Sequence, residues 1–495
     1  MNASLPLVLC ITIVLGTVLA SLAYARRRAA LNARSMDEWA VGGRRLGAWI
    51  FWFVNAGEIY TTFAVLGISG YAWAYGAPAY IAFTSVSLAC ALGYWLMPKI
   101  WHAGKRLGLV TQADFFSRRY DAPWLGVIVG LAGIAALVVY VQIQLTALTL
   151  VFRLTLGAAL SPAQAAVLAA GIMLAFVYLA GLRSAAFAAG VKDVLMIALV
   201  VLLSLTVAEK VGASSMLDVF RRVQDLHPGI GRFPGLQPEA GLDNTWLVTA
   251  AINVALGTWI FPHMFQLCFS ARDARTIRRN AIWQPLYSLS YFFILLLGFG
   301  ALLAGTQPDG GNLNAVLLQF VADQYPPWAV GLLAGTVCLL ALVPGSLLLL
   351  TAASIFGRNV ALPLRPGLSE SAQVWVARAA MIVFAAIAVW LTLTSNESLV
   401  AIGLSAYAAI GMLAPGVFLG FLWRRTSAQG VLAGLVAGYC VLLVPAARDV
   451  AASLLPSWDK GLVAMGVNAL VVVLVSALRP ASQRSTFSET AHSGT

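Results

Sequence analysis

Apolar residues dominate the chain in long blocks that short polar stretches separate at regular intervals. A helix needs about 18 or more consecutive, mostly apolar residues to cross a bilayer. We place thirteen such segments, with boundaries good to about four residues, at residues 5–25, 48–72, 78–97, 124–152, 163–181, 188–208, 244–269, 284–306, 328–357, 373–394, 399–422, 427–446 and 461–478. The pattern predicts an all-α polytopic membrane protein with about 13 transmembrane helices.

The composition supports a single membrane domain. Apolar residues make up 60% of the 495 positions and charged residues only 10%, whereas about 25% is usual in soluble domains. The longest polar stretch, 209–244, is too short to bury a core of its own. We therefore expect one transmembrane domain over 1–478, in the lipid bilayer, and a short polar tail over 479–495.

The positions of the basic residues explain the net charge of +12 without a nucleic-acid partner. Most Lys and Arg residues, with Lys192 counted among them, fall in alternate loops, as the positive-inside rule requires. Arg26, Arg27 and Arg28 follow the first apolar segment and no basic residue precedes it, which is the reverse of a signal peptide. We predict an inner-membrane protein with its N-terminus outside and its C-terminus in the cytoplasm.

This topology contains two groups of five helices with opposite orientation, at about 48–208 and 244–422, as in an inverted repeat. The first helix of each group is interrupted. Residues 49–70 (WIFWFVNAGEIYTTFAVLGISG) carry polar residues at mid-depth, and 244–269 contain Gly257 and Pro262. Two interrupted helices in corresponding positions predict a midplane binding site, although Pro and Gly are also common in ordinary membrane helices.

Glu58 is the leading candidate for chemistry because an intramembrane carboxylate is costly and needs a reason to be there. It can bind a cation or a proton, or it can hydrogen-bond a neighbouring helix. The predicted substrate-binding residues are Asn55, Glu58, Thr61, Thr62, Gln144, Trp259 and His263. Trp259 can stack on a solute or simply pack, and His263 can serve as a gate or proton group or as an interfacial histidine.

Enzymatic chemistry has no support in the sequence. Catalytic triads, phosphate loops and metal-ligand spacings are absent, and the four histidines lie far apart. We expect no enzyme activity, no cofactor and no metal other than a coupling cation.

Five segments, in order, resemble the sodium:solute symporter family. They are SMDEWAVGGRRLG (35–47), LGLVTQADFFSRRYDAPWLG (107–126), YLAGLRSAAFAAGVKDVLM (178–196), FPHMFQLCFSARDARTIRRNAIWQPLYSL (261–289) and ALVPGSLLLLTAASIFGRNV (341–360). The fourth and fifth are most similar to the monocarboxylate permease branch of that family. The resemblance implies a LeuT-type 5+5 inverted repeat with one extra helix before it and two after it, working by alternating access.

The resemblance also implies a sodium site between the first repeat helix and the helix over 328–357. Its ligands would come from Gly57, Glu58 and Tyr60 on one side and from Val343 and Ser346 on the other. A hydroxyl pair is expected on the second side, but the sequence has Val343 and Pro344. Pro344 and Gly345 should also interrupt that helix. The coupling ion is therefore left open as sodium or a proton.

The sequence and this resemblance thus favour a cation-coupled secondary active transporter that imports a small organic solute, and the resemblance implies a monocarboxylate. The charge of Glu58 would oppose an anion unless a cation or proton neutralised it, which is itself a means of coupling. The alternative is a membrane sensor that uses a symporter-like bundle without net transport.

Overall fold

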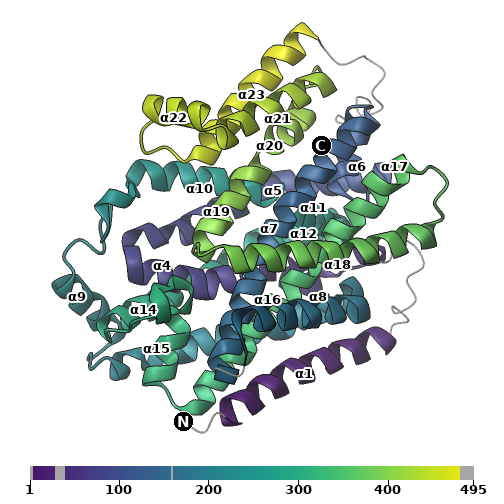
Figure 1. Cartoon of the computed structure of the whole chain (residues 1–495). Coiled ribbons are helices and arrows are strands. Elements are labelled where there is room, and N and C mark those ends of the chain that lie inside the picture. Colours follow the sequence, from purple (N-terminus) through teal and green to yellow (C-terminus); the bar gives the residue numbers. More distant parts are fainter. Residues whose placement is uncertain (1–3, 28–39, 158–159, 480–495) are drawn as a thin grey trace.

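The computed structural model describes residues 4–27, 40–157 and 160–479. These residues are helical apart from short connections (Figure 1), and within them the backbone pairs in a strand-like manner only at the Leu46–Ala271 bridge. The all-α prediction is confirmed. The predicted tail lies almost wholly outside the described residues, which end at Arg479.

The helices follow one another with few long connections. The α-helices are α1 (Ser4–Arg27), α3 (Ala48–Gly57), α4 (Ile68–Tyr75), α5 (Ile81–Leu107), α6 (Gln112–Arg119), α7 (Pro123–Leu156), α8 (Pro162–Lys210), α9 (Met216–Leu226), α10 (Asn244–Thr258), α11 (Pro262–Ser270), α12 (Ala274–Trp283), α13 (Pro285–Ser288), α14 (Ser290–Leu303), α15 (Val316–Gln324), α16 (Pro327–Ile355), α17 (Leu362–Leu364), α18 (Glu370–Thr394), α19 (Leu399–Gly411), α20 (Ala414–Leu422), α21 (Ala428–Leu443), α22 (Pro445–Leu454) and α23 (Lys460–Leu478).

Eight of the described helices are long and apolar enough to cross a membrane, or up to eleven if each bent pair is one span. The predicted count of thirteen is not confirmed. It would be reached only by adding the interrupted helix at 48–75 and the shorter apolar segment Pro162–Tyr178. Both predicted spans at 163–181 and 188–208 fall within α8, which the structure assigns as one 49-residue helix.

The centre of the bundle consists of α7, α8 and α16, which pack against one another. Among the eight described helices of membrane-spanning length, the one that contains α16 is the most enclosed, with 94% of its most apolar 18-residue stretch buried. Helix α1 packs on α16 and α8 at one flank, and α21 packs on α23 at the opposite side of the molecule (Figure 1). The terminal helices therefore flank a central group instead of contributing to it.

The structure shows three sharp bends in apolar helices, each just before a helix with proline in its first turn. Helices α10 and α11 meet at 47°, and α19 and α20 meet at 41°. Pro262 and Pro415 occupy the first turns of α11 and α20, where the missing amide of proline costs nothing. Helix α22 turns away from α21 by 86°, so α21 alone accounts for the predicted span at 427–446.

The interruption predicted at Pro344 is wrong. Helix α16 continues through Pro344 to Ile355 and only then becomes a π-helical segment, Phe356–Ala361. Surrounding helices bury α16 along its length, and such packing can hold a proline-containing membrane helix together. The irregular backbone that was predicted at Pro344 lies instead after the end of α16, at Phe356–Ala361.

Helix α6 ties distant parts of the bundle together through buried polar side chains. Asp114 caps α6 within a capping box formed with Thr111. Its carboxylate accepts hydrogen bonds from Arg358 Nε at 2.8 Å and Asn359 Nδ2 at 2.8 Å. At the other end of α6, Arg119 Nε donates to the Gly420 carbonyl at 2.6 Å. Helix α6 thus connects the π-helical end of α16 to α20.

We expect Asp114→Ala to destabilise the protein by about 2–4 kcal/mol because it removes a helix cap and leaves Arg358 and Asn359 without their acceptor. Reversible unfolding in mixed micelles measures this change. Asp225→Ala, at an exposed position, is the matched control and should fall within about 0.5 kcal/mol of the parent protein. Equal stabilities would contradict a structural role for the cluster.

Candidate functional site

The first interrupted helix is open at the predicted position. Helix α3 ends at Gly57, residues 58–61 leave the helical path, and a π-helical turn, Phe63–Gly67, leads into α4. The amide of Ala64 would bond the Tyr60 carbonyl in a regular helix, but it donates to the Thr61 carbonyl instead, at 3.0 Å. The Tyr60 carbonyl is thus released from the α-helical ladder.

Glu58 lies in this opening and is almost fully buried, with 2% of its surface exposed. In the described part of the chain neither carboxylate oxygen has a hydrogen-bond partner. The nearest basic group is His263, whose Nε2 lies 3.8 Å from Glu58 Oε2, too far for a hydrogen bond. A buried carboxylate without partners is expensive, so this position suits a ligand that is not part of the chain.

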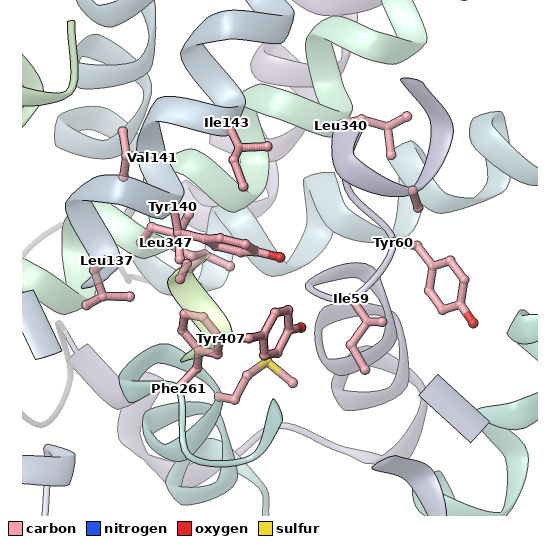
Figure 2. Packing of buried hydrophobic residues seen from close by; sticks show 14 of the residues in the cluster. Ile59, Tyr60, Leu137, Tyr140, Val141, Ile143, Phe261, Leu340, Leu347 and Tyr407 are labelled. Carbon is pink, nitrogen blue, oxygen red and sulfur yellow. The ribbon is translucent and has the colours of Figure 1, made fainter. Parts of the chain in front are cut away.

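Aromatic side chains from three elements gather beside this acid. Ring centroids lie 5.1 Å apart for Tyr140 and Phe261, 4.9 Å for Phe261 and Tyr407, and 5.4 Å for Phe261 and His263. Figure 2 shows the rings of Tyr140, Phe261 and Tyr407 together, with Ile59 and Tyr60 on the broken helix across from them. These rings form an aromatic group at the meeting point of α7, α19 and the two interrupted helices.

Other predicted residues join the opening to neighbouring helices. Thr62 Oγ1 donates to Gln144 Oε1 on α7 at 2.8 Å, and Asn55 Nδ2 donates to Gln284 Oε1 at 2.9 Å. The phenol of Tyr60 donates to Ser288 Oγ at 3.0 Å. Asn55 Oδ1 and Gln144 Nε2 are buried without a partner, so both amides keep hydrogen-bonding capacity. Thr61 is also buried there and interacts with Tyr140.

The polar groups of two predicted residues, Trp259 and Ser346, donate hydrogen bonds to backbone carbonyls of the bundle. Trp259 donates its indole N–H to the Ala89 carbonyl at 2.6 Å and packs against α5. Ser346 donates to the Val343 carbonyl within α16 at 2.6 Å. Among the described residues no hydrogen bond joins Val343 or Ser346 to the opening in α3, and their part in a sodium site stays a prediction.

The second interruption, between α10 and α11, is held by a side chain from α6. Gln112 Nε2 donates to the Ile260 carbonyl, which lies in the break. Gln112 is buried and is the first residue of α6. A freed carbonyl at this break thus receives a protein donor, whereas the carboxylate at the first break receives none.

Sequence reasoning missed two charged residues at the first break. Lys192 and Asp193, from α8, are both completely buried and form an ion pair at 2.7 Å. Lys192 Nζ donates to the carbonyls of Gly57 at 2.8 Å and Tyr60 at 3.3 Å. Counting Lys192 among cytoplasmic loop residues was therefore wrong. The signal was available, because a Lys-Asp pair inside the predicted span 188–208 is itself unusual.

A membrane-embedded helical bundle with two interrupted helices and a buried acid between them defines a secondary transporter. The chain belongs to the sodium:solute symporter family, whose sequence profile matches residues 39–438. It is 31% identical to the uncharacterized symporter YhjB of Bacillus subtilis (strain 168), over 96% of this chain and 97% of that protein. It is 28% identical to the monocarboxylate transport permease protein of Rhizobium johnstonii, covering 90% and 91% of the two chains.

The fold is similar to that of a Na⁺-coupled sialic acid symporter solved in a substrate-bound outward-open state. The TM-score is 0.78 at 17% sequence identity, covering 97% of this chain and 99% of that chain. The LeuT-type architecture expected from the sequence is confirmed. The protein is accordingly a multi-pass, cation-coupled symporter.

Proposed function

We propose that this symporter imports a small organic anion of the monocarboxylate class and that the opening around Glu58 is its binding site. The observation that carries the proposal is the buried, unpartnered carboxylate of Glu58, 3.8 Å from His263 and beside the aromatic group. The name of the Rhizobium johnstonii relative supports the solute class. We also propose that the two repeats span about 48–208 and 244–422, within one transmembrane domain over 1–478.

The surroundings suit a molecule with one charged end and one apolar end. The rings of Tyr140, Phe261 and Tyr407 offer an apolar surface for an alkyl group. Helix α11 begins at Pro262, beside His263, and the amino end of a helix attracts a carboxylate. The free amide capacity of Gln144 and Asn55 adds hydrogen-bonding groups for the solute.

Coupling follows from the charge of Glu58. An anion entering this site meets a like charge in a medium of low polarity, where repulsion is strong. A cation or proton bound at Glu58 removes the repulsion, so each ligand favours the binding of the other. We propose sodium or a proton for this role, in an inner-membrane protein with its N-terminus outside and its C-terminus in the cytoplasm.

Counterflow in proteoliposomes tests the solute and the ion together. Vesicles preloaded with unlabelled pyruvate, lactate or proline are diluted into labelled solute, with sodium and proton gradients imposed separately. We expect exchange of pyruvate and lactate but not of proline. Exchange of proline alone would contradict the proposed solute class, and uptake that ignores both gradients would contradict coupling.

We expect Phe261→Ala to raise the KM for the monocarboxylate about tenfold, because it removes an apolar ring from the proposed site. Initial rates of uptake at several solute concentrations measure the change. Phe292→Ala is a suitable control, since Phe292 is partly exposed on α14 and contacts Phe220 instead. An unchanged KM for Phe261→Ala would place the solute elsewhere.

A further inference from the structure

The opening in the first helix exposes two backbone carbonyls that have no helical partner. The Gly57 carbonyl faces the stretch where the helix stops, and the Tyr60 carbonyl has lost the Ala64 amide to Thr61. Unwound carbonyls of this kind bind the coupling cation in transporters built on interrupted helices. The physical question is which cation occupies them here.

The ammonium of Lys192 occupies them. An ammonium has three N–H donors, and Lys192 Nζ has three oxygen atoms in reach. Two are hydrogen-bond acceptors, the Gly57 carbonyl at 2.8 Å and the Tyr60 carbonyl at 3.3 Å. The third, Asp193 Oδ1 at 2.7 Å, forms an ion pair with the ammonium. The side chain is completely buried. A free cation would compete with it for the same oxygens and would also meet its charge at short range.

Gly57 is the residue that lets the pair come this close. A Cβ atom on Gly57 would lie 2.8 Å from Lys192 Nζ and 2.8 Å from Asp193 Oδ2. Since real Cβ atoms do not approach polar atoms so closely, any side chain there would displace the ion pair. The bare backbone of Gly57 and the pair on α8 therefore form one fitted arrangement.

The charges around the first helix break indicate which group can bind a mobile cation. Lys192 and Asp193 neutralise each other, and both lie close enough to Glu58 to act on it electrostatically. Both carboxylates lack a hydrogen bond within the described residues, but Asp193 is 2.7 Å from the ammonium of Lys192, whereas Glu58 has only His263 Nε2, at 3.8 Å. A mobile cation is therefore attracted to Glu58 and not to the carbonyls of Gly57 and Tyr60.

We propose that Lys192 is a tethered cation that fills the carbonyl site of the first helix break, excludes sodium from it, and leaves Glu58 as the place for the mobile cation. Asp193 holds the ammonium in position. This inference rests on the proposed function for its meaning in transport. The experiment below measures only sodium binding. Its outcome therefore does not depend on whether the protein takes up monocarboxylates.

Equilibrium binding of radioactive sodium to the purified, monodisperse full-length protein tests the proposal. The parent for comparison is Glu58→Gln, which should bind no sodium. Adding Lys192→Ala should create about one sodium site per molecule, because the carboxylate of Asp193 and two carbonyls become vacant. Adding Asp193→Asn to that protein should abolish the new site, and Lys192→Arg in place of Lys192→Ala should not create one.

Competition by methylammonium is a second measurement. It distinguishes a Lys192 that takes the place of a cation from a Lys192 that only stabilises the structure. Methylammonium, which mimics the missing end of Lys192, should displace sodium from the Glu58→Gln/Lys192→Ala protein. Lys210→Ala, at the end of the same helix, is the matched control and should bind no sodium in the Glu58→Gln background. If Lys192→Ala does not yield monodisperse protein, sodium binding to the Glu58→Gln protein with Lys192 intact still tests whether the ammonium excludes sodium.

Three results would overturn the proposal. Saturable sodium binding to Glu58→Gln with Lys192 intact would show that the tethered ammonium does not exclude the ion. Equal sodium stoichiometry with and without Lys192 would show that no cation site lies beneath it. Sodium binding to Lys192→Ala that methylammonium does not displace would place the new site elsewhere.

Discussion

Glu58→Gln should abolish concentrative uptake while leaving solute exchange across the membrane intact. Glutamine has nearly the shape of glutamate but cannot carry a charge, so it no longer repels an anion or attracts a cation. Solute binding then loses its dependence on the ion. We expect the accumulation ratio driven by an ion gradient to fall about 100-fold, the scale of a strong coupling between two sites.

Two vesicle measurements give this result. Uptake under an imposed gradient reports coupling, and counterflow without a gradient reports solute binding and movement. Glu209→Gln is the control, because Glu209 is an exposed acid near the end of α8 and should behave like the unsubstituted protein. If Glu58→Gln accumulates solute as well as the control does, Glu58 has no part in coupling and the proposed mechanism fails.

Asp193→Asn should be the most destabilising single polar substitution in the bundle. Removing one partner of a buried ion pair leaves the other charge without compensation, which costs about 3–5 kcal/mol. Lys192 would keep its two carbonyl acceptors but lose the negative charge of Asp193, 2.7 Å away. Reversible unfolding in mixed micelles measures the free energy.

Two comparison variants make this measurement specific. Asp449→Asn removes the acid of an exposed pair, with 3.9 Å between Arg448 Nε and Asp449 Oδ1, and should cost at most about 1 kcal/mol. The double variant Lys192→Met/Asp193→Asn should recover much of the lost stability, because no charge remains unpaired. Equal losses for Asp193→Asn and Asp449→Asn would contradict a compensating role for the buried pair.

The sequence alone determined the class of protein. Apolar blocks of bilayer length fix a helical membrane bundle, because a chain in lipid must satisfy its backbone hydrogen bonds within each helix. The interruptions at residues 57–62 and 257–262 were readable because polar residues in the first, and Gly257 with Pro262 in the second, weaken a helix inside an apolar block. Glu58 was identified because the free-energy cost of a carboxylate inside the membrane is evident from the sequence, without knowledge of its contacts.

Only the tertiary structure decided which groups meet. Trp259 turns to the Ala89 carbonyl, while Phe261 and Tyr407, which no local pattern marks, gather beside Tyr140. Pro344 leaves α16 intact because neighbouring helices enclose it. Lys192 lies 135 positions from Gly57, and no spacing rule predicts an ammonium that crosses between helices to fill a break. The free-energy cost of placing a polar side chain in an apolar segment can be read from the sequence, because it depends on that segment alone. Which groups contact that side chain depends on how distant segments pack together.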